Sequence, residues 1–437
     1  MKKFIFMITI IFLVSTNLKA VDISGEIDSS YFAAIKNYDS YRKYLKLDLI
    51  YDKAFDNTEI KAIVRAENDS IRVTTPERVY LREAYINQDI YFNKIFDSLN
   101  FKFGKILYTW GNADELKPVD ILNPQDLSFL LFKPIQERKY GLFSGNLTLY
   151  LTENLFIEMV ALPQFQPTDI SSKIFVIKEM ADIESNPLYT LNNSIEPDDN
   201  LKSASYASRI GLMLFDIDTH LIYYKGYDHL SVLETSLVNP TNGSMSLTPV
   251  YKKIEMFGFD FQRALFSGIS IRGEIAYFPM GKYFSLSSEP AISTNPLSSP
   301  FMKNLMIGGN GTVQKKSIEY TAGFDANKLF IKNLYANFQI NGQYIIDHSS
   351  DLADEQNSNS LLGTLEYTFL REKMKTKVKG FYNINEKAYA IGLDISYKIS
   401  NNYEITSGTW FLDGKEDTEY GQFKDNDFAY IEGKVVF

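Results

Sequence analysis

The sequence predicts an all-β protein, a transmembrane antiparallel β-barrel of about sixteen to eighteen strands. Segments in which apolar and polar residues alternate recur almost from end to end of the 437 residues. No segment after the amino terminus offers about 20 uninterrupted apolar residues, so the pattern excludes a helical membrane protein. Every second connection between the alternating segments is short, and the long connections fall between these short ones, as they do when one end of a barrel carries the loops.

The amino terminus carries a predicted signal peptide. Lys2 and Lys3 precede an apolar run from Phe4 to Val14, and a polar stretch then leads to Ala20. A charged start, a short apolar run and a small residue at the cleavage point are typical of secretory signal peptides. We therefore expect residues 1–20 to be removed and residues 21–437 to form the barrel in an outer membrane.

Eighteen alternating segments are predicted as strands, and the count falls to sixteen if the weak segments 23–36 and 154–163 are misread. In the second segment, for example, Leu45, Leu47 and Leu49 alternate with Lys46 and Asp48. The predicted strands cover residues 23–36, 41–53, 58–69, 78–90, 99–110, 138–151, 154–163, 203–215, 217–228, 251–264, 267–279, 315–327, 331–346, 360–371, 374–384, 388–399, 402–413 and 426–437.

The connections between these strands are sorted by length. If the first strand runs outward, the periplasmic turns are short and fall near residues 56–57, 91–97, 152–153, 216, 265–266, 328–329, 372–373 and 401. The long connections all fall on the outer side, at residues 111–137, 164–202, 229–250, 280–314, 347–359 and 414–425. This asymmetry is characteristic of outer-membrane barrels.

One connection is unusually rich in residues that fix turns. It follows the fifth strand, and its candidate site residues are Trp110, Gly111, Asp114, Asp120, Asn123, Pro124 and Asp126. Gly and Pro interrupt strands, while Asp and Asn side chains bond to nearby backbone. Two interpretations remain open: a constriction or plug inside the lumen, or a self-packed loop that seals the barrel mouth.

A family resemblance covers about 50 of the 437 residues. Four short segments carry it: Leu81-Arg82-Glu83-Ala84-Tyr85, Phe103-Gly104-Lys105, Trp110-Gly111 and residues 120–127. Together they resemble a block found in Gram-negative outer-membrane barrels, some of unassigned function and some alginate-export-like porins. Ile106 stands where that block usually has Gln. The resemblance implies an outer-membrane location and a transport role, with no particular substrate.

The carboxyl terminus resembles the last strand of such barrels. Phe437, Val435, Gly433 and Ile431 share one face, while Lys434 and other polar residues share the opposite face. A strand of this kind fits lipid on one side and water on the other. By the resemblance, Phe437 belongs to the signal that the barrel-assembly machinery reads. Outer-membrane lipid and that machinery are therefore expected partners.

Charged residues at alternate positions are expected to line the lumen. The candidates are Arg65, Arg272, Glu274, Lys375, Lys377 and Lys379. The three lysines share one face of one strand and could attract anions, whereas Glu366 and Asp394 on neighbouring strands could neutralise them.

The sequence predicts neither an enzyme nor a cofactor or metal site. Its three histidines, His220, His229 and His348, lie outside the usual hydrolase and zinc motifs. There is no Cys, and the formal net charge of −9 without a basic tract argues against nucleic-acid binding. The predicted function is a channel or porin that passes small solutes or one specific substrate. The alternative is a surface adhesin or structural barrel without transport.

Overall fold

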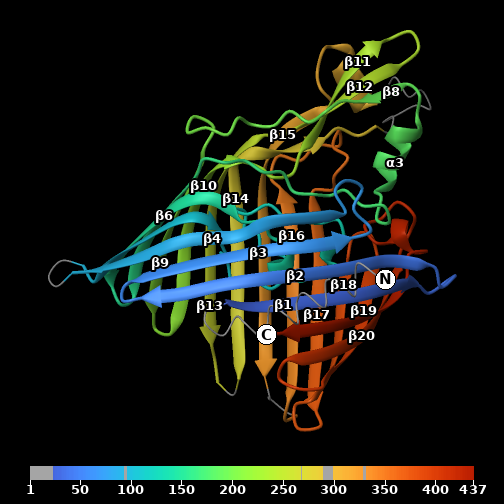
Figure 1. Ribbon diagram of the computed structural model, residues 1–437. Coiled ribbons are helices and arrows are strands. Elements are labelled where there is room, and N and C mark those ends of the chain that lie inside the picture. Colours follow the sequence, from blue (N-terminus) through green and yellow to red (C-terminus); the bar gives the residue numbers. More distant parts are fainter. Residues whose placement is uncertain (1–22, 93–95, 267, 289–298, 328–330) are drawn as a thin grey trace.

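The computed structural model describes residues 23–92, 96–266, 268–288, 299–327 and 331–437. Eighteen strands form one sheet in which each strand pairs with its neighbours and β21 pairs back with β1, so the barrel is closed (Figure 1). The predicted signal peptide and the predicted turn at 328–329 lie outside the described residues.

All eighteen predicted strands are strands of the wall, so the count is eighteen and the weak segments 23–36 and 154–163 were rightly included. The wall consists of β1 (Ile23–Ala34), β2 (Ser40–Phe55), β3 (Thr58–Asp69), β4 (Glu77–Tyr91), β5 (Ser98–Ile106), β6 (Leu142–Thr152), β7 (Leu155–Leu162), β9 (Ser205–Leu214), β10 (Ile217–Tyr227), β13 (Lys253–Ala264), β14 (Ile269–Ser285), β15 (Thr312–Asn327), β16 (Leu334–Ile345), β17 (Asn357–Phe369), β18 (Met374–Asn383), β19 (Ala388–Lys398), β20 (Tyr403–Asp413) and β21 (Phe428–Val436).

Of the strand boundaries that differ from the prediction, two have a clear physical reason. β5 ends at Ile106 because the backbone N–H of Tyr108 leaves the ladder and donates to the Asn123 side chain, at 2.6 Å. β14 continues to Ser285, beyond the predicted end at 279, because an irregularity between Phe278 and Lys282 lets pairing with β15 resume. Gly281 provides the left-handed backbone there, with φ of 87°.

The outer face of the wall is apolar, as a membrane-spanning barrel requires. On β19 the exposed side chains are Tyr389, Ile391, Leu393, Ile395 and Tyr397, so a tyrosine flanks three aliphatic residues at each end. At ~3.4 Å per residue this row is roughly 27 Å long, similar to the apolar band of such barrels. Among the described residues, we find no helix with the length and apolar character to cross a membrane.

The two ends of the barrel differ as the sequence predicted. The long connections all lie at one end, here called the loop end, and the other end, here called the turn end, carries short connections. At the loop end, β8 (Tyr189–Leu191), β11 (Val232–Asn239) and β12 (Ser244–Val250) form a separate three-stranded sheet that projects beyond the wall (Figure 1). Helices α3 (Lys178–Ser185) and α4 (Pro300–Met306) pack beside it around a small apolar core.

Candidate functional site

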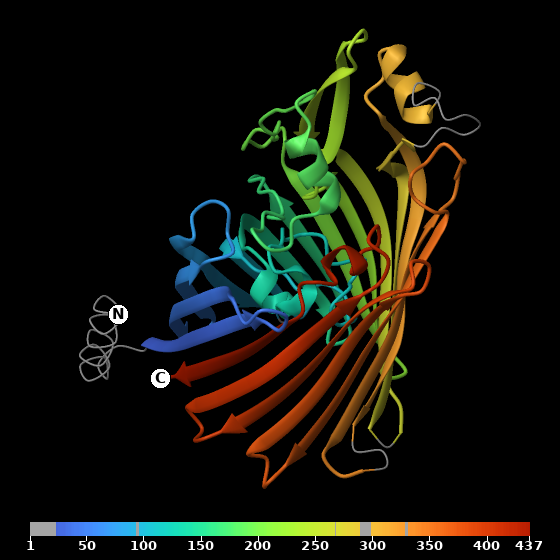
Figure 2. The same ribbon diagram turned by 90° about the vertical axis from the view of Figure 1, so that its right-hand side faces the viewer.

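Residues 107–141, here called the lumen segment, connect β5 to β6 and fold into the barrel (Figure 2). They include the short helix α2 (Ile135–Arg138). The tip of the segment reaches the opposite wall. Asn112 donates to Asp260 on β13 at 2.8 Å, and the Ala113 N–H donates to Glu274 on β14 at 2.5 Å. The Thr321 hydroxyl on β15 donates to the Leu116 carbonyl at 3.2 Å.

Asn123 joins the two ends of the lumen segment. Its Oδ1 accepts from the Tyr108 N–H, and its Nδ2 donates to the carbonyls of Ile106 at 3.1 Å and Tyr140 at 2.8 Å. The carbonyl of the next residue, Pro124, accepts from the Tyr140 N–H at 2.9 Å. One buried amide therefore fixes where the chain leaves β5 and where it returns to β6.

Two buried aspartates hold the segment through cations. Asp120 accepts from the Trp110 N–H at 3.3 Å and from the Lys139 ammonium. Asp126 accepts from Arg72, from Lys133 at 3.0 Å and from Ser128. Burial alone would raise the pKa of Asp126, but the positive charges of Lys133 and Arg72 outweigh it and hold that pKa well below its usual range.

Gly111 and Asp114 place the tip against the far wall. Gly111 has φ of 76°, and a Cβ there would lie 2.5 Å from the Glu274 carboxylate, so both the conformation and the space require glycine. Asp114 accepts from Arg272 at 3.1 Å, and its N–H donates to Gln339 on β16 at 3.4 Å. Burial raises the pKa of Asp114, although Arg272 opposes that effect.

An ionic network attaches α2 to β2 and β3. Arg65 forms two hydrogen bonds with Asp48, at 2.7 and 2.6 Å, and lies 2.9 Å from Glu137. Lys46 lies 3.4 Å from Glu137 and 2.8 Å from Glu26. Burial on its own would raise the pKa of Glu137, but the charges of Arg65 and Lys46 lower it to about 2.

The lumen segment also packs on apolar parts of the inner wall, beside the charged positions that were expected to line the lumen. Trp110, Val119 and Leu122 are buried against wall residues that include Tyr224 and Phe278. On the other side of the barrel, aromatic residues from three connections meet the wall in a second core: Phe129, Phe132, Phe175, Phe423, Phe32, Phe381, Trp410 and Phe428. The first core could have been predicted from apolar residues at inward-facing positions of the strands, such as Ile222, Tyr224 and Met256.

The block Leu81–Tyr85 contains a bulge. β3 and β4 pair Ile63 with Glu83 and then Val64 with Leu81, so Arg82 is the extra residue. Arg82 and Glu83 consequently both reach the lumen segment. Arg82 donates to the Gln136 carbonyl, and Glu83 accepts from the Leu107 N–H at 3.3 Å.

The three lysines of β18 each have a carboxylate partner. Lys375 lies 3.7 Å from Glu366, Lys377 lies 3.0 Å from Asp394, and Lys379 lies 2.6 Å from Glu115 at the tip of the lumen segment. The first two partners are those that the sequence suggested. Glu115 was missed because its contact depends on a loop that crosses the barrel, which strand alternation does not report.

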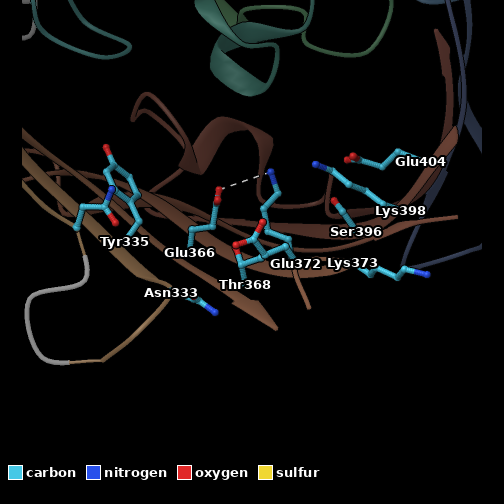
Figure 3. Close-up of a pocket in the computed structure, with 11 residues that line it drawn as sticks. Asn333, Tyr335, Glu366, Thr368, Glu372, Lys373, Ser396, Lys398 and Glu404 are labelled. Carbon is cyan, nitrogen blue, oxygen red and sulfur yellow. Dashed lines mark ion pairs between the residues drawn. The ribbon is translucent and has the colours of Figure 1, made fainter. Parts of the chain in front are cut away.

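Two of the cavities of the described structure lie on the inner side of this wall. The cavity at the turn end has a volume of about 390 Å³ and carries cations and carboxylates in equal number: Lys373, Lys375, Lys398, Glu366, Glu372 and Glu404. Figure 3 shows this cavity, with the ion pair between Glu366 and Lys375 as a dashed line. The cavity at the loop end has a volume of about 690 Å³ and is lined by Glu115, Lys117, Thr321, Asn341 and other residues.

The histidines are held by neighbouring groups. His220 faces inward and lies 2.7 Å from Asp260, while His229 contacts the carbonyls of Gln166 and Leu122 at 2.8 and 3.3 Å. His348 contacts the Asp354 carbonyl at 2.9 Å. Within the described part of the chain, no group of three or more metal-binding side chains converges.

Phe437 lies where the barrel closes. Its N–H donates to the Gly25 carbonyl at 2.9 Å, and its carbonyl accepts from the Gly25 N–H at 2.8 Å. Its ring covers Gly25 so closely that a Cβ there would lie 2.4 Å from the ring. The alternation read in the sequence also holds: Lys434 faces inward and pairs with Glu26, while Ile431 is exposed on the outer face.

Comparison with known proteins gives a family and a fold. Residues 19–437 match the sequence model of a family described as "Protein of unknown function (DUF1302)". No curated protein matches the chain.

Two solved structures resemble this barrel. OccAB1 of Acinetobacter baumannii has a TM-score of 0.50 and 7% identity over 95% of each chain. The outer membrane protein opdK from Pseudomonas aeruginosa has a TM-score of 0.50 and 8% identity over 95% of this chain and 98% of its own. At such low identities the likeness shows the fold alone.

Proposed function

The chain belongs to the DUF1302 family, whose function is not assigned, and we propose that it is an outer-membrane channel that passes small solutes through a lumen narrowed by residues 107–141. One observation carries the proposal. Polar side chains of β15–β18 line the wall from the loop-end cavity to the turn-end cavity, and the tip of the lumen segment contacts that wall between them. A water-filled path with charged walls and one narrow point is the arrangement that selective pores use.

The location is part of the same proposal. A closed barrel with an apolar outer face and many polar side chains on its inner face suits a lipid bilayer. The fold likeness to an outer membrane protein supports the outer membrane, and the predicted signal peptide at residues 1–20 would direct export. On this view the turn end faces the periplasm, the loop end faces outside, and the barrel-assembly machinery reads the terminal strand ending at Phe437.

Planar-bilayer recording tests the proposal. Purified barrel should give discrete single-channel steps in KCl, and the steps should grow when the tip of the lumen segment is removed. A well-folded barrel that stays electrically silent, with or without the tip, would contradict transport.

The alternative function, a surface adhesin or structural barrel, is favoured by one feature. The sheet of β8, β11 and β12 projects from the loop end and exposes apolar side chains such as Leu191 and Val238. Such side chains occur at protein interaction sites. A silent barrel that nevertheless binds cells or surfaces through this sheet would support the alternative.

A further inference from the structure

Glu115 at the tip of the lumen segment is held between two cations. Its carboxylate lies 2.6 Å from the Lys379 ammonium and 3.1 Å from the Arg138 guanidinium. All three side chains are shielded, with exposed fractions of 13% for Glu115, 14% for Lys379 and 0% for Arg138. Glu115 also lines the loop-end cavity, so this carboxylate stands at the boundary between the cavity and the lysines of β18.

The two cations have contacts besides the Glu115 carboxylate, and one of these is the Glu115 backbone carbonyl, which accepts from Arg138 at 3.2 Å. Arg138 also donates to the Gln125 side chain at 3.2 Å and to the Lys133 carbonyl at 3.0 Å. Lys379 lies over the ring of Phe381, 5.0 Å from its centroid. If the Glu115 carboxylate rotated away, a preformed pair of positive charges would remain, with no change in the backbone.

The carboxylate itself is incompletely bound. One of its oxygens, Oε2, has no hydrogen bond of good geometry, although Arg138 is near. The tip has other attachments, through Asp114 to Arg272 and through the Leu116 carbonyl to Thr321. The side chain of Glu115 can therefore leave its site while the tip stays in place.

We propose that Lys379 and Arg138 form a binding site for the oxyanion of a transported solute, a carboxylate or phosphate, and that Glu115 is a tethered carboxylate that occupies this site until the solute displaces it. The proposal rests on the proposed channel function and adds a substrate class and a gate. Arg and Lys bind carboxylate and phosphate through charge-assisted hydrogen bonds. Beyond this site, Lys377 and Lys375 follow along β18 toward the turn end. An anion that has passed the site replaces Asp394 as the partner of Lys377 and then Glu366 as the partner of Lys375.

On this assignment, the lysines are not expected to give a simple anion-selective pore. With Glu115 in place, each lysine has a carboxylate partner and the wall is close to neutral. Only the displacement of Glu115 leaves an excess of positive charge, and that excess lies at the boundary of the cavity. Selectivity is then expected for solutes that carry an oxyanion able to compete with a carboxylate.

The test compares Glu115→Gln with the wild type in planar bilayers under a KCl gradient. The Gln side chain keeps the size but removes the charge. We expect the chloride-to-potassium permeability ratio to rise by roughly three- to tenfold, the effect of removing one charge in a partly hydrated pore. Adding Lys379→Met to Glu115→Gln should cancel that rise. Glu416→Gln is the matched control, because Glu416 pairs with Lys424 on the exposed surface of the loop end.

Block of the chloride current by potassium acetate and by inorganic phosphate identifies the ligand chemistry. Both probes should act at lower concentration on Glu115→Gln than on the wild type, and glycerol should have no effect. An unchanged permeability ratio in a conducting Glu115→Gln channel would overturn the oxyanion site and leave the channel function standing. A folded barrel without current in the wild type, in Glu115→Gln and in a tip deletion would instead overturn the channel function.

Discussion

At the scale of the residue, Asn123 shows how one amide fixes the path of a long connection. It replaces three backbone hydrogen bonds that the sheet would otherwise provide for residues 106, 108 and 140. Asn123→Ala leaves these groups buried without partners, so we expect a loss of at least about 2 kcal/mol in the free energy of unfolding. Heat-modifiable gel mobility against temperature measures it. Asn242→Ala, in the exposed turn between β11 and β12, is the control and should change little; equal melting of both variants would contradict the role of Asn123.

Glu137 gives a prediction about pH. Its pKa is lowered to about 2 from an ordinary value of 4.5, so its ionic contacts stabilise the folded state fully above about pH 5. This contribution is lost as the pH falls from 4.5 toward 2. The melting temperature of the wild type should therefore exceed that of Glu137→Gln by a constant amount near neutral pH, and the difference should shrink below pH 4.5. A melting-temperature difference that is unchanged at pH 2.5 would show that Arg65 and Lys46 do not lower the pKa of this carboxylate.

At the scale of the element, the strands and the lengths of the connections were predictable, but the folding of the long connections was not. Strand alternation is local, because each residue faces either lipid or lumen, and β2 or β19 can be read without knowing its neighbours. The fate of the lumen segment depends on partners far away in sequence, such as Glu274 and Lys379. The sequence indicated a turn-fixing segment from Trp110 to Asp126 but left its position open. It likewise gave no sign of β8, which pairs parallel with β12 over only three residues.

Two deletions separate the roles of the connections. Residues 112–126 include the tip of the lumen segment, which reaches β13–β18. Residues 164–202 lie over the lumen segment on its loop-end side, and the two are joined by the Leu127 N–H, which donates to the Asp169 carbonyl at 2.7 Å. Replacing 112–126 by a short linker should raise single-channel conductance and also lower stability, because Val119 and Leu122 leave an apolar core. Deleting 164–202 should change conductance far less. The reverse order of conductance would identify the outer connection as the obstruction.

At the scale of the whole molecule, the barrel exists only because its last strand meets its first. β1 and β21 pair from Glu26 with Val436 to Ala34 with Phe428, and the contact between Gly25 and Phe437 extends this seam by one more pair. An unpaired edge in a bilayer would leave backbone groups without partners, at a cost of several kcal/mol each. The position of Phe437 therefore has a structural consequence in the finished barrel, separate from any recognition during assembly.

Variants at this seam can separate the two roles of Phe437. Deleting Phe437 removes both backbone bonds and the ring, whereas Phe437→Ala keeps the bonds. If the residue serves as an assembly signal, both variants should lower the amount of folded barrel in the membrane fraction; if it only completes the seam, the deletion should be clearly worse. Gly25→Ala adds a methyl group 2.4 Å from the ring and should reduce folding in the wild type. It should be tolerated in the Phe437→Ala background, where the ring is gone. Normal amounts of folded barrel after deletion of Phe437, measured by heat-modifiable mobility, would contradict both roles.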